Sequence, residues 1–224
     1  MNNIQSLLAL FKREILISYR NLSDILSILL FFLMGMVIFV LSVGPDDKIF
    51  NKINIGIIWT LILFSNTLAI KKIFQDDFDD NSIIIFHLSG LSYEIISAVK
   101  IIVQWFYLQL PFLFTVILTN ILLNIETHNL KKILVSFLIG SLIITCITSI
   151  SGSMNLLNKK NFAIGSLIIM IFSIPVIVFS VGFINSSEEI AKAQLNILLG
   201  VMFFFLAISP WICGLCIKIS LQNK

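Results

Sequence analysis

The fold is decided by the apolar stretch at residues 22–43, LSDILSILLFFLMGMVIFVLSV, in which Asp24 is the only charged residue. A membrane-spanning helix needs about 20 such residues, because each adds about 1.5 Å toward roughly 30 Å of hydrocarbon. Five further apolar runs follow, at residues 53–70, 101–123, 133–154, 162–184 and 195–217. The chain is therefore predicted to cross a membrane six times.

The composition agrees with this prediction. Of the 224 residues, 58% are hydrophobic and 12% are charged, and the mean hydropathy is +1.03. A soluble domain needs far more charge on its surface. None of the six runs alternates with the period of two that is typical of an outer-membrane barrel, so helices must satisfy the backbone in lipid. We expect an all-α polytopic membrane protein, with residues 1–224 forming a single integral membrane domain.

The lysines and arginines indicate the orientation, because segments rich in them tend to stay in the cytoplasm. With six spans, ten of the chain's fifteen Lys and Arg lie on the side of the N-terminus and five lie on the other. Both termini are therefore predicted to be cytoplasmic. The connection at residues 71–100 is predicted to be a cytoplasmic coupling loop.

An amphipathic helix is predicted ahead of the first span. Apolar residues recur there at helical spacing, at Ile4, Leu7, Leu8, Phe11 and Ile15, while Ser6, Arg13 and Arg20 face the other way. We interpret it as an elbow helix along the cytoplasmic leaflet of the lipid bilayer, with Phe11, Arg13 and Arg20 as its functional residues. A plain extension of the first span is the alternative.

The densest charge in the chain lies between the second and third runs, at residues 74–80, FQDDFDD, which hold four of its 12 acidic residues. Phe74 and Phe78 are four residues apart and share a helix face, while the aspartates repel one another unless they are solvated or paired. We predict a coupling helix that docks a partner through Phe74, Asp76, Asp77, Phe78, Asp79, Asp80 and Ser82. A solvated acidic turn is the alternative.

Motifs for catalysis are missing from the sequence. It has no G-x-S-x-G and no H-E-x-x-H, and no Gly-Lys pair from which a P-loop could be built. The predicted spans also lack the mid-membrane ionisable residue that is usual in ion-coupled carriers. We therefore expect a protein that is not an enzyme, and whose energy for transport would come from a separate ATPase chain.

No metal or haem site is assigned from the sequence. His87 and His128 are predicted on opposite sides of the membrane, and neither lies in a cluster with metal-ligand spacing. An axial contact from His128 to a passing haem is the alternative. The Cys213-x-x-Cys216 pair lies inside a predicted span, where we interpret it as helix packing.

The fourth span carries small polar residues on one face, at Ser141, Thr145, Thr148 and Gly152. Small residues let membrane helices approach closely and exchange side-chain hydrogen bonds. We therefore interpret this face as packing within the bundle. A polar wall of a translocation pathway is the alternative.

Several short motifs occur in an order that resembles the haem exporter protein B family. They are Leu41-Ser42-Val43-Gly44-Pro45, Gly56-Ile57-Ile58-Trp59, Phe74-Gln75-Asp76-Asp77 with Asp80 and Ser82, and Ser209-Pro210 with Lys218-Ile219-Ser220. The likeness extends from Glu14 to the C-terminus. The chain departs from the family by having Asn81 and Ile84 where a Gly and a Glu are usual, and Gly90 and Ser92 where prolines are usual.

The resemblance implies an ABC-2-type permease in the ATP-binding-cassette complex of cytochrome c maturation. Such a complex joins two permease chains to two ATPase subunits, which bind the ATP, and to other membrane subunits of the maturation system. It implies haem as the cargo, released at the external face, and a place in the bacterial inner membrane or the mitochondrial inner membrane. No nucleic acid is expected as a partner.

Two other functions remain open from the sequence. One is an ABC-2-type export permease for another lipid-like or hydrophobic substrate. The other is a membrane assembly factor that transports nothing.

Overall fold

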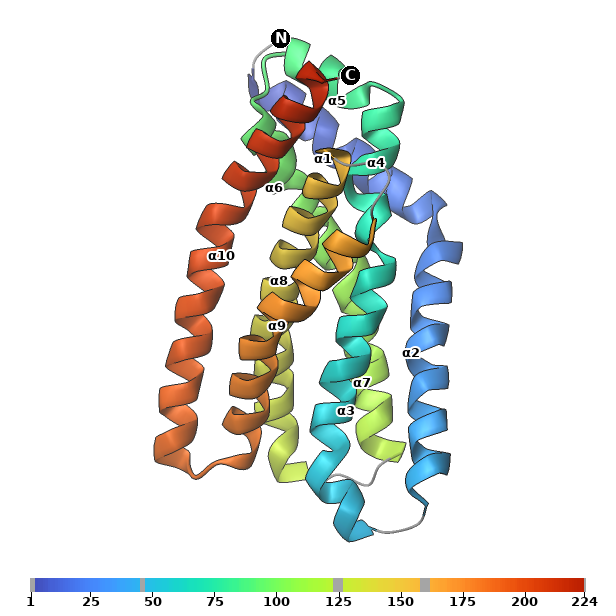
Figure 1. Cartoon of the computed structure of the whole chain (residues 1–224), viewed down its shortest axis with the longest axis vertical. Coiled ribbons are helices and arrows are strands. Elements are labelled where there is room, and N and C mark those ends of the chain that lie inside the picture. The colour runs from blue at the N-terminus through green and yellow to red at the C-terminus, as the bar shows by residue number, and fades with distance from the viewer. Residues whose placement is uncertain (1–2, 45–46, 123–126, 158–161, 224) are drawn as a thin grey trace.

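The structure is a computed structural model that describes residues 3–44, 47–122, 127–157 and 162–223. All elements in these residues are helices (Figure 1). Six helical stretches, two of which join more than one of these helices, are long and apolar enough to cross a membrane. The prediction of an all-α polytopic membrane protein is confirmed. The elements are α1 Asn3–Arg20, α2 Leu22–Val43, α3 Asp47–Leu68, α4 Ile70–Asp79, α5 Ser82–Leu88, α6 Tyr93–Gln104, the π-helix η1 Trp105–Gln109, α7 Leu110–Leu122, α8 Thr127–Leu157, α9 Phe162–Asn185 and α10 Glu188–Gln222.

The first helix is an elbow, as expected, and is not an extension of the first span. A break at Asn21 separates α1 from α2, and α1 runs obliquely across one end of the bundle before α2 turns along it (Figure 1). The side of α1 that carries Ser6 and Leu10 is buried and packs against α6. Ile4 and Leu8 on another side are 72% and 61% exposed, which suits a helix lying in the membrane interface.

Both ends of the chain lie at the same end of the bundle as α1, α4 and α5 (Figure 1). At the opposite end of the bundle α2 ends and α3 begins, and α9 ends and α10 begins there too. An even number of crossings requires this arrangement. We call the end with α1, α4 and α5 the elbow end.

The α8 helix is the centre of the bundle. It packs against α4, α9 and α10 and also contacts α3, α6 and α7. Several of its buried hydroxyls donate to carbonyls of the preceding turn, as Thr145 does to Ser141 at 2.9 Å and Thr148 to Ile144 at 2.7 Å. Such bonds let a polar stripe be buried without water.

The helix after the second span differs from the predicted loop. Where hydropathy places the start of a loop at residue 71, α4 continues to Asp79 after a break at Ala69 alone. Polarity does not end a helix; a change of backbone conformation does. The chain turns at Asn81, whose φ is +59°, and again at Gly90, whose φ is +95°.

The third span also begins earlier than residue 101. Ser92 caps α6 by accepting a hydrogen bond from the Ile95 amide at 3.4 Å. Lys100 therefore lies inside the helix, about two turns from its start. Residue 100 is the last residue of the loop predicted at residues 71–100, so the structure differs from the prediction there.

A π-helical segment, η1, interrupts the third span directly before Pro111. Proline has no amide hydrogen to donate, and its ring clashes with the carbonyl four residues earlier. The local widening to η1 avoids that conflict. It also turns Gln109 into the interior of the bundle, where this residue is 1% exposed.

We predict that Gly152→Ala destabilises the bundle by about 1–3 kcal/mol. An added Cβ would lie 2.9 Å from the Ile70 carbonyl oxygen of α4, and backbone there cannot move without separating α4 from α8. The measurement is the thermal unfolding midpoint of the purified chain in detergent. Gly200→Ala is the control, because nothing lies within 4 Å of the added atom; equal midpoints for the two variants would contradict the close helix contact.

Candidate functional site

The predicted docking segment has two opposite faces in the structure. Phe74 and Phe78 do share a face of α4, but each is only 1% exposed, and both pack in the core with Ile150 and Ile217. Asp76, Asp79 and Asp80 are exposed at the elbow end, and Gln75 donates a hydrogen bond to Asp79 at 2.8 Å. Only the acidic part of the predicted surface can therefore meet a partner directly.

Asp77 points inward and joins a buried cluster of four charges. Arg13 Nη2 donates to Asp77 Oδ1 at 2.5 Å, and Arg13 Nη1 donates to Glu14 Oε1 at 2.8 Å. Lys100 Nζ donates to Glu14 Oε2 at 3.0 Å and also to Asp77 Oδ2. Two cations and two carboxylates thus form a closed ring of ion pairs, which we call the charge cluster.

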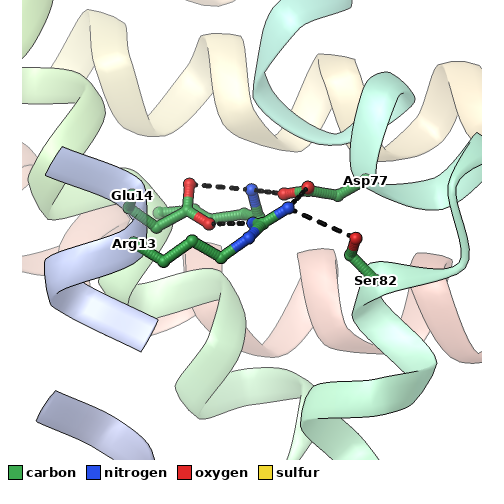
Figure 2. A network of polar contacts seen from close by, with 5 residues as sticks. Arg13, Glu14, Asp77 and Ser82 are labelled. Atoms are coloured by element: carbon green, nitrogen blue, oxygen red, sulfur yellow. Dashed lines mark hydrogen bonds and ion pairs between the residues drawn. The ribbon is translucent and has the colours of Figure 1, made fainter. Parts of the chain in front are cut away.

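Further contacts extend the cluster to α5. Figure 2 shows Arg13 and Glu14 of α1 facing Asp77 of α4 and Ser82 of α5. Arg13 Nη2 also donates to Ser82 Oγ at 3.2 Å, and the guanidinium carbon lies 5.2 Å from the centre of the Phe86 ring, a cation–π distance. Four helices, α1, α4, α5 and α6, therefore meet at one group of side chains.

The cluster is buried enough that each charge depends on the others. The side chain of Lys100 is 4% exposed, those of Asp77 and Glu14 are 10% and 11% exposed, and that of Arg13 is 30% exposed. Burial alone would lower the pKa of Arg13, but the hydrogen bond and charge of Asp77, followed by those of Glu14, raise it above its usual value. Arg13 therefore stays charged, and the cluster is neutral when its four members are ionised.

Sequence reasoning missed two of the four members. Arg13 and Asp77 were candidates, but Glu14 and Lys100 were not assigned a role. The sequence does contain a signal for them, because each is a charged residue among apolar residues of a helix. A charge in such a place needs an oppositely charged partner. The sequence does not say which charge meets which, because the partners lie 23 to 86 residues apart.

The polar face of the fourth span is buried inside the chain. Ser141 accepts a hydrogen bond from Trp105 Nε1 at 3.1 Å, and Thr145 accepts one from Gln109 Nε2 at 3.2 Å. The same amide donates to Asn66 Oδ1 at 2.8 Å. These bonds tie η1 to α3 and α8, and Gly152 contacts α4 as described above. The geometry favours packing; a role in a pathway stays a prediction.

The remaining elbow residues lie apart from the charge cluster. Phe11 is half-buried and lines a groove between α1 and the third span. Arg20, the last residue of α1, is exposed. Neither contacts Asp77 or Lys100 in any hydrogen bond or ion pair of the described residues.

Side chains that could hold a metal or haem are few in the described part of the chain. No group of three or more His, Cys, Asp or Glu residues there is arranged to hold a metal ion. His87 stacks on Tyr93 with ring centres 4.1 Å apart, and its Nδ1 lies 2.9 Å from the Leu91 carbonyl oxygen. The His128 side chain lies outside the described residues, so its predicted haem contact stays untested.

The protein family described as "CcmB protein" matches residues 5–220 of the chain. The chain belongs to this family. It is 28% identical over 218 residues to a Haemophilus influenzae protein named "Heme exporter protein B", a match that covers 96% of this chain and 99% of that one. It is 23% identical to a protein of that name from Pseudomonas aeruginosa, covering 98% and 99%. An Escherichia coli protein of that name is 33% identical over 46% of this chain and 47% of its own length.

This family membership confirms the resemblance that the short motifs indicated. The matched region contains all members of the charge cluster and the whole of α4. The site therefore lies within the region that the family model matches.

We predict that Lys100→Met destabilises the chain by about 3–5 kcal/mol, because Glu14 and Asp77 would then share one cation while buried. The measurement is the thermal unfolding midpoint of the purified chain in detergent. Lys192→Met, at an exposed position of α10, is the control and should leave the midpoint unchanged.

The double variant Lys100→Met with Asp77→Asn tests the pairing itself. In the double variant the Asp77 carboxylate that Lys100→Met leaves without its cation is also removed. Part of the stability lost in Lys100→Met should therefore return. A double variant whose midpoint falls by the sum of the two single effects would show that the two side chains do not interact.

Proposed function

We propose that this chain is the permease subunit of an ATP-binding-cassette complex that handles haem during cytochrome c maturation. The family, the six spanning helices and the name of the relatives that match nearly the full chain support this proposal. The chain contains no Gly-Lys pair and hence no P-loop, so ATP is bound by a partner ATPase.

The elbow end faces the cytoplasm of a bacterial cell in this proposal, and the chain lies in the inner membrane. The excess of Lys and Arg on the side of both termini supports that orientation. The ATPase then meets the end of the bundle that carries α1, α4 and α5.

The ATPase docks on the exposed carboxylates of α4, at Asp76, Asp79 and Asp80. These residues lie within a turn of Asp77, whose side chain is held by Arg13 and Lys100. A displacement of α4 is therefore passed to α1 and α6, because breaking the charge cluster would leave buried charges unpaired. The charge cluster is the single observation on which this coupling role rests.

Phe74 and Phe78 have a different role from the one expected at first. Buried against α8 and α10, they anchor α4 to the core of the bundle. Force applied to the carboxylates therefore reaches the spanning helices and does not simply bend the end of α4.

The chain contributes mechanical work to haem transfer, and other membrane subunits of the maturation system hold the haem. In support, no group of three or more His, Cys, Asp or Glu residues in the described part of the chain is arranged to hold a metal ion, and the three cysteines Cys146, Cys213 and Cys216 are buried in the bundle. A second copy of the chain completes a symmetric complex with two ATPases, as in other ABC-2-type permeases.

The docking surface is tested by co-purification. The triple variant Asp76→Asn, Asp79→Asn and Asp80→Asn should lose at least about tenfold in ATPase affinity, since each lost charge contact contributes on the order of 0.5–1 kcal/mol. The control is Glu188→Gln with Glu189→Gln, which neutralises exposed acids at the other end of the bundle. Equal recovery of the ATPase with both variants would contradict docking on α4.

The haem function is tested by deleting the gene and measuring covalently bound haem in c-type cytochromes. We expect these cytochromes to be lost and to return with the wild-type chain. An intact set of c-type cytochromes would instead favour an export permease for another lipid-like substrate. If complementation succeeds without any bound ATPase, the assembly-factor function is favoured.

A further inference from the structure

An apolar groove of about 400 Å³ lies between the elbow helix and the third span. One wall is formed by Phe11, Ile15 and Tyr19 of α1, and the other by Phe106 of η1 and Leu110 of α7. Its size falls in the range of about 300–1,000 Å³ that is usual for small-molecule sites. A ligand in this groove goes beyond the proposed function, because neither haem transfer nor ATPase docking involves the groove.

The groove lies where the first span begins, since Leu22 at the start of α2 also lines it. Tyr19 is 69% exposed, Phe106 is 50% exposed and Leu110 is 42% exposed, so the walls are themselves in contact with the surroundings. The bottom is closed by Ile25 and Val103, which are buried. A molecule that fills it must therefore be apolar and must enter from the membrane.

The polar side chains that line the groove are Ser18, Tyr19 and Tyr107. Tyr107 donates its hydroxyl hydrogen to the Asn21 carbonyl oxygen at 2.7 Å. The nearby carboxylates of Glu14 and Asp77 face an adjoining small crevice, which shares Ser18, Val103 and Tyr107 with the groove. The interior of the groove thus calls for a hydrocarbon chain and offers no ligand for a metal or a polar cofactor.

Basic side chains lie at the outer surface of the same helix. Lys12 is exposed and lies seven residues before Tyr19, which puts the two on one face of α1. Arg20 is exposed at the end of α1, next to Tyr19. Cationic side chains at the membrane surface attract anionic lipid headgroups by about 1 kcal/mol each.

We propose that this groove binds one acyl chain of an anionic glycerophospholipid, whose headgroup contacts Lys12 and Arg20. The acyl chain fills the space between α1 and η1, so the tilt of the elbow helix depends on the lipid. Because α1 carries Arg13 and Glu14, lipid occupancy also supports the position of the charge cluster.

The test is native mass spectrometry of the full chain, purified in detergent and supplied with palmitoyl-oleoyl phosphatidylglycerol or with phosphatidylcholine of the same chains. We expect one phosphatidylglycerol to remain on each chain and about tenfold less phosphatidylcholine, equivalent to about 1.4 kcal/mol. Lys12→Gln with Arg20→Gln should abolish this preference.

Two bulky variants test the position of the lipid. Ile15→Trp fills the groove from α1 and Leu110→Trp fills it from α7, and each should lower the retained lipid about tenfold, since excluding two methylenes costs on the order of 0.8 kcal/mol apiece. Leu16→Trp is the matched control, because Leu16 is 53% exposed and does not line the groove. It should retain lipid as the wild-type chain does.

Several results would overturn the proposal. Equal lipid retention by Ile15→Trp, Leu110→Trp and Leu16→Trp would show that the lipid binds elsewhere. Retention of added haemin in place of lipid, lost in Ile15→Trp, would assign the groove to haem. A lipid-free dimer that dissociates in Ile15→Trp would assign it to a second copy of the chain.

Discussion

Four mutually paired charges, three of them buried and the fourth half-buried, hold the helices together at the elbow end. Arg13, Glu14, Asp77 and Lys100 come from three helices, and each makes hydrogen bonds with two of the others. Moving any one away from the rest would leave a charge in a low-dielectric environment, which costs several kcal/mol. The elbow helix, the end of the second span and the start of the third therefore hold a fixed relation to one another.

The packing of the rest of the bundle would transmit a displacement of α4 at the elbow end to the spanning helices. The α4 helix continues the second span with one break at Ala69, and Phe74 and Phe78 fix it to α8 and α10. The α8 helix in turn contacts nearly every spanning element. Thr145 and Thr148 of α8 donate to carbonyls of their own helix, while Gln109 and Trp105 donate to side chains of neighbouring helices. Close packing and a small number of hydrogen bonds between helices therefore hold the bundle.

The sequence predicted the fold well, because hydropathy alone determines the number and position of spans such as Leu22–Val43. It also predicted the elbow helix and the helix that carries Phe74 and Phe78 from local patterns. It did not predict that this helix continues the second span with one break at Ala69, because hydropathy registers polarity and not backbone geometry. It recognised that Phe74 and Phe78 share a face but not that this face is buried, since burial depends on α8 and α10, which lie far along the chain.

If the charge cluster couples α1 to α4, the two helices move as one body. Pulsed electron paramagnetic resonance tests this coupling with spin labels at Leu16→Cys of α1, which is 53% exposed, and Gln75→Cys of α4, which is half-buried, in a chain whose native cysteines are replaced by alanine. We expect the distance between the two labels to stay unchanged when the assembled complex is trapped with a nonhydrolysable ATP analogue. We also expect the distance from Gln75→Cys to a label on Glu188 at the opposite end to change. A change in the distance between the first two labels would show that α1 and α4 move independently.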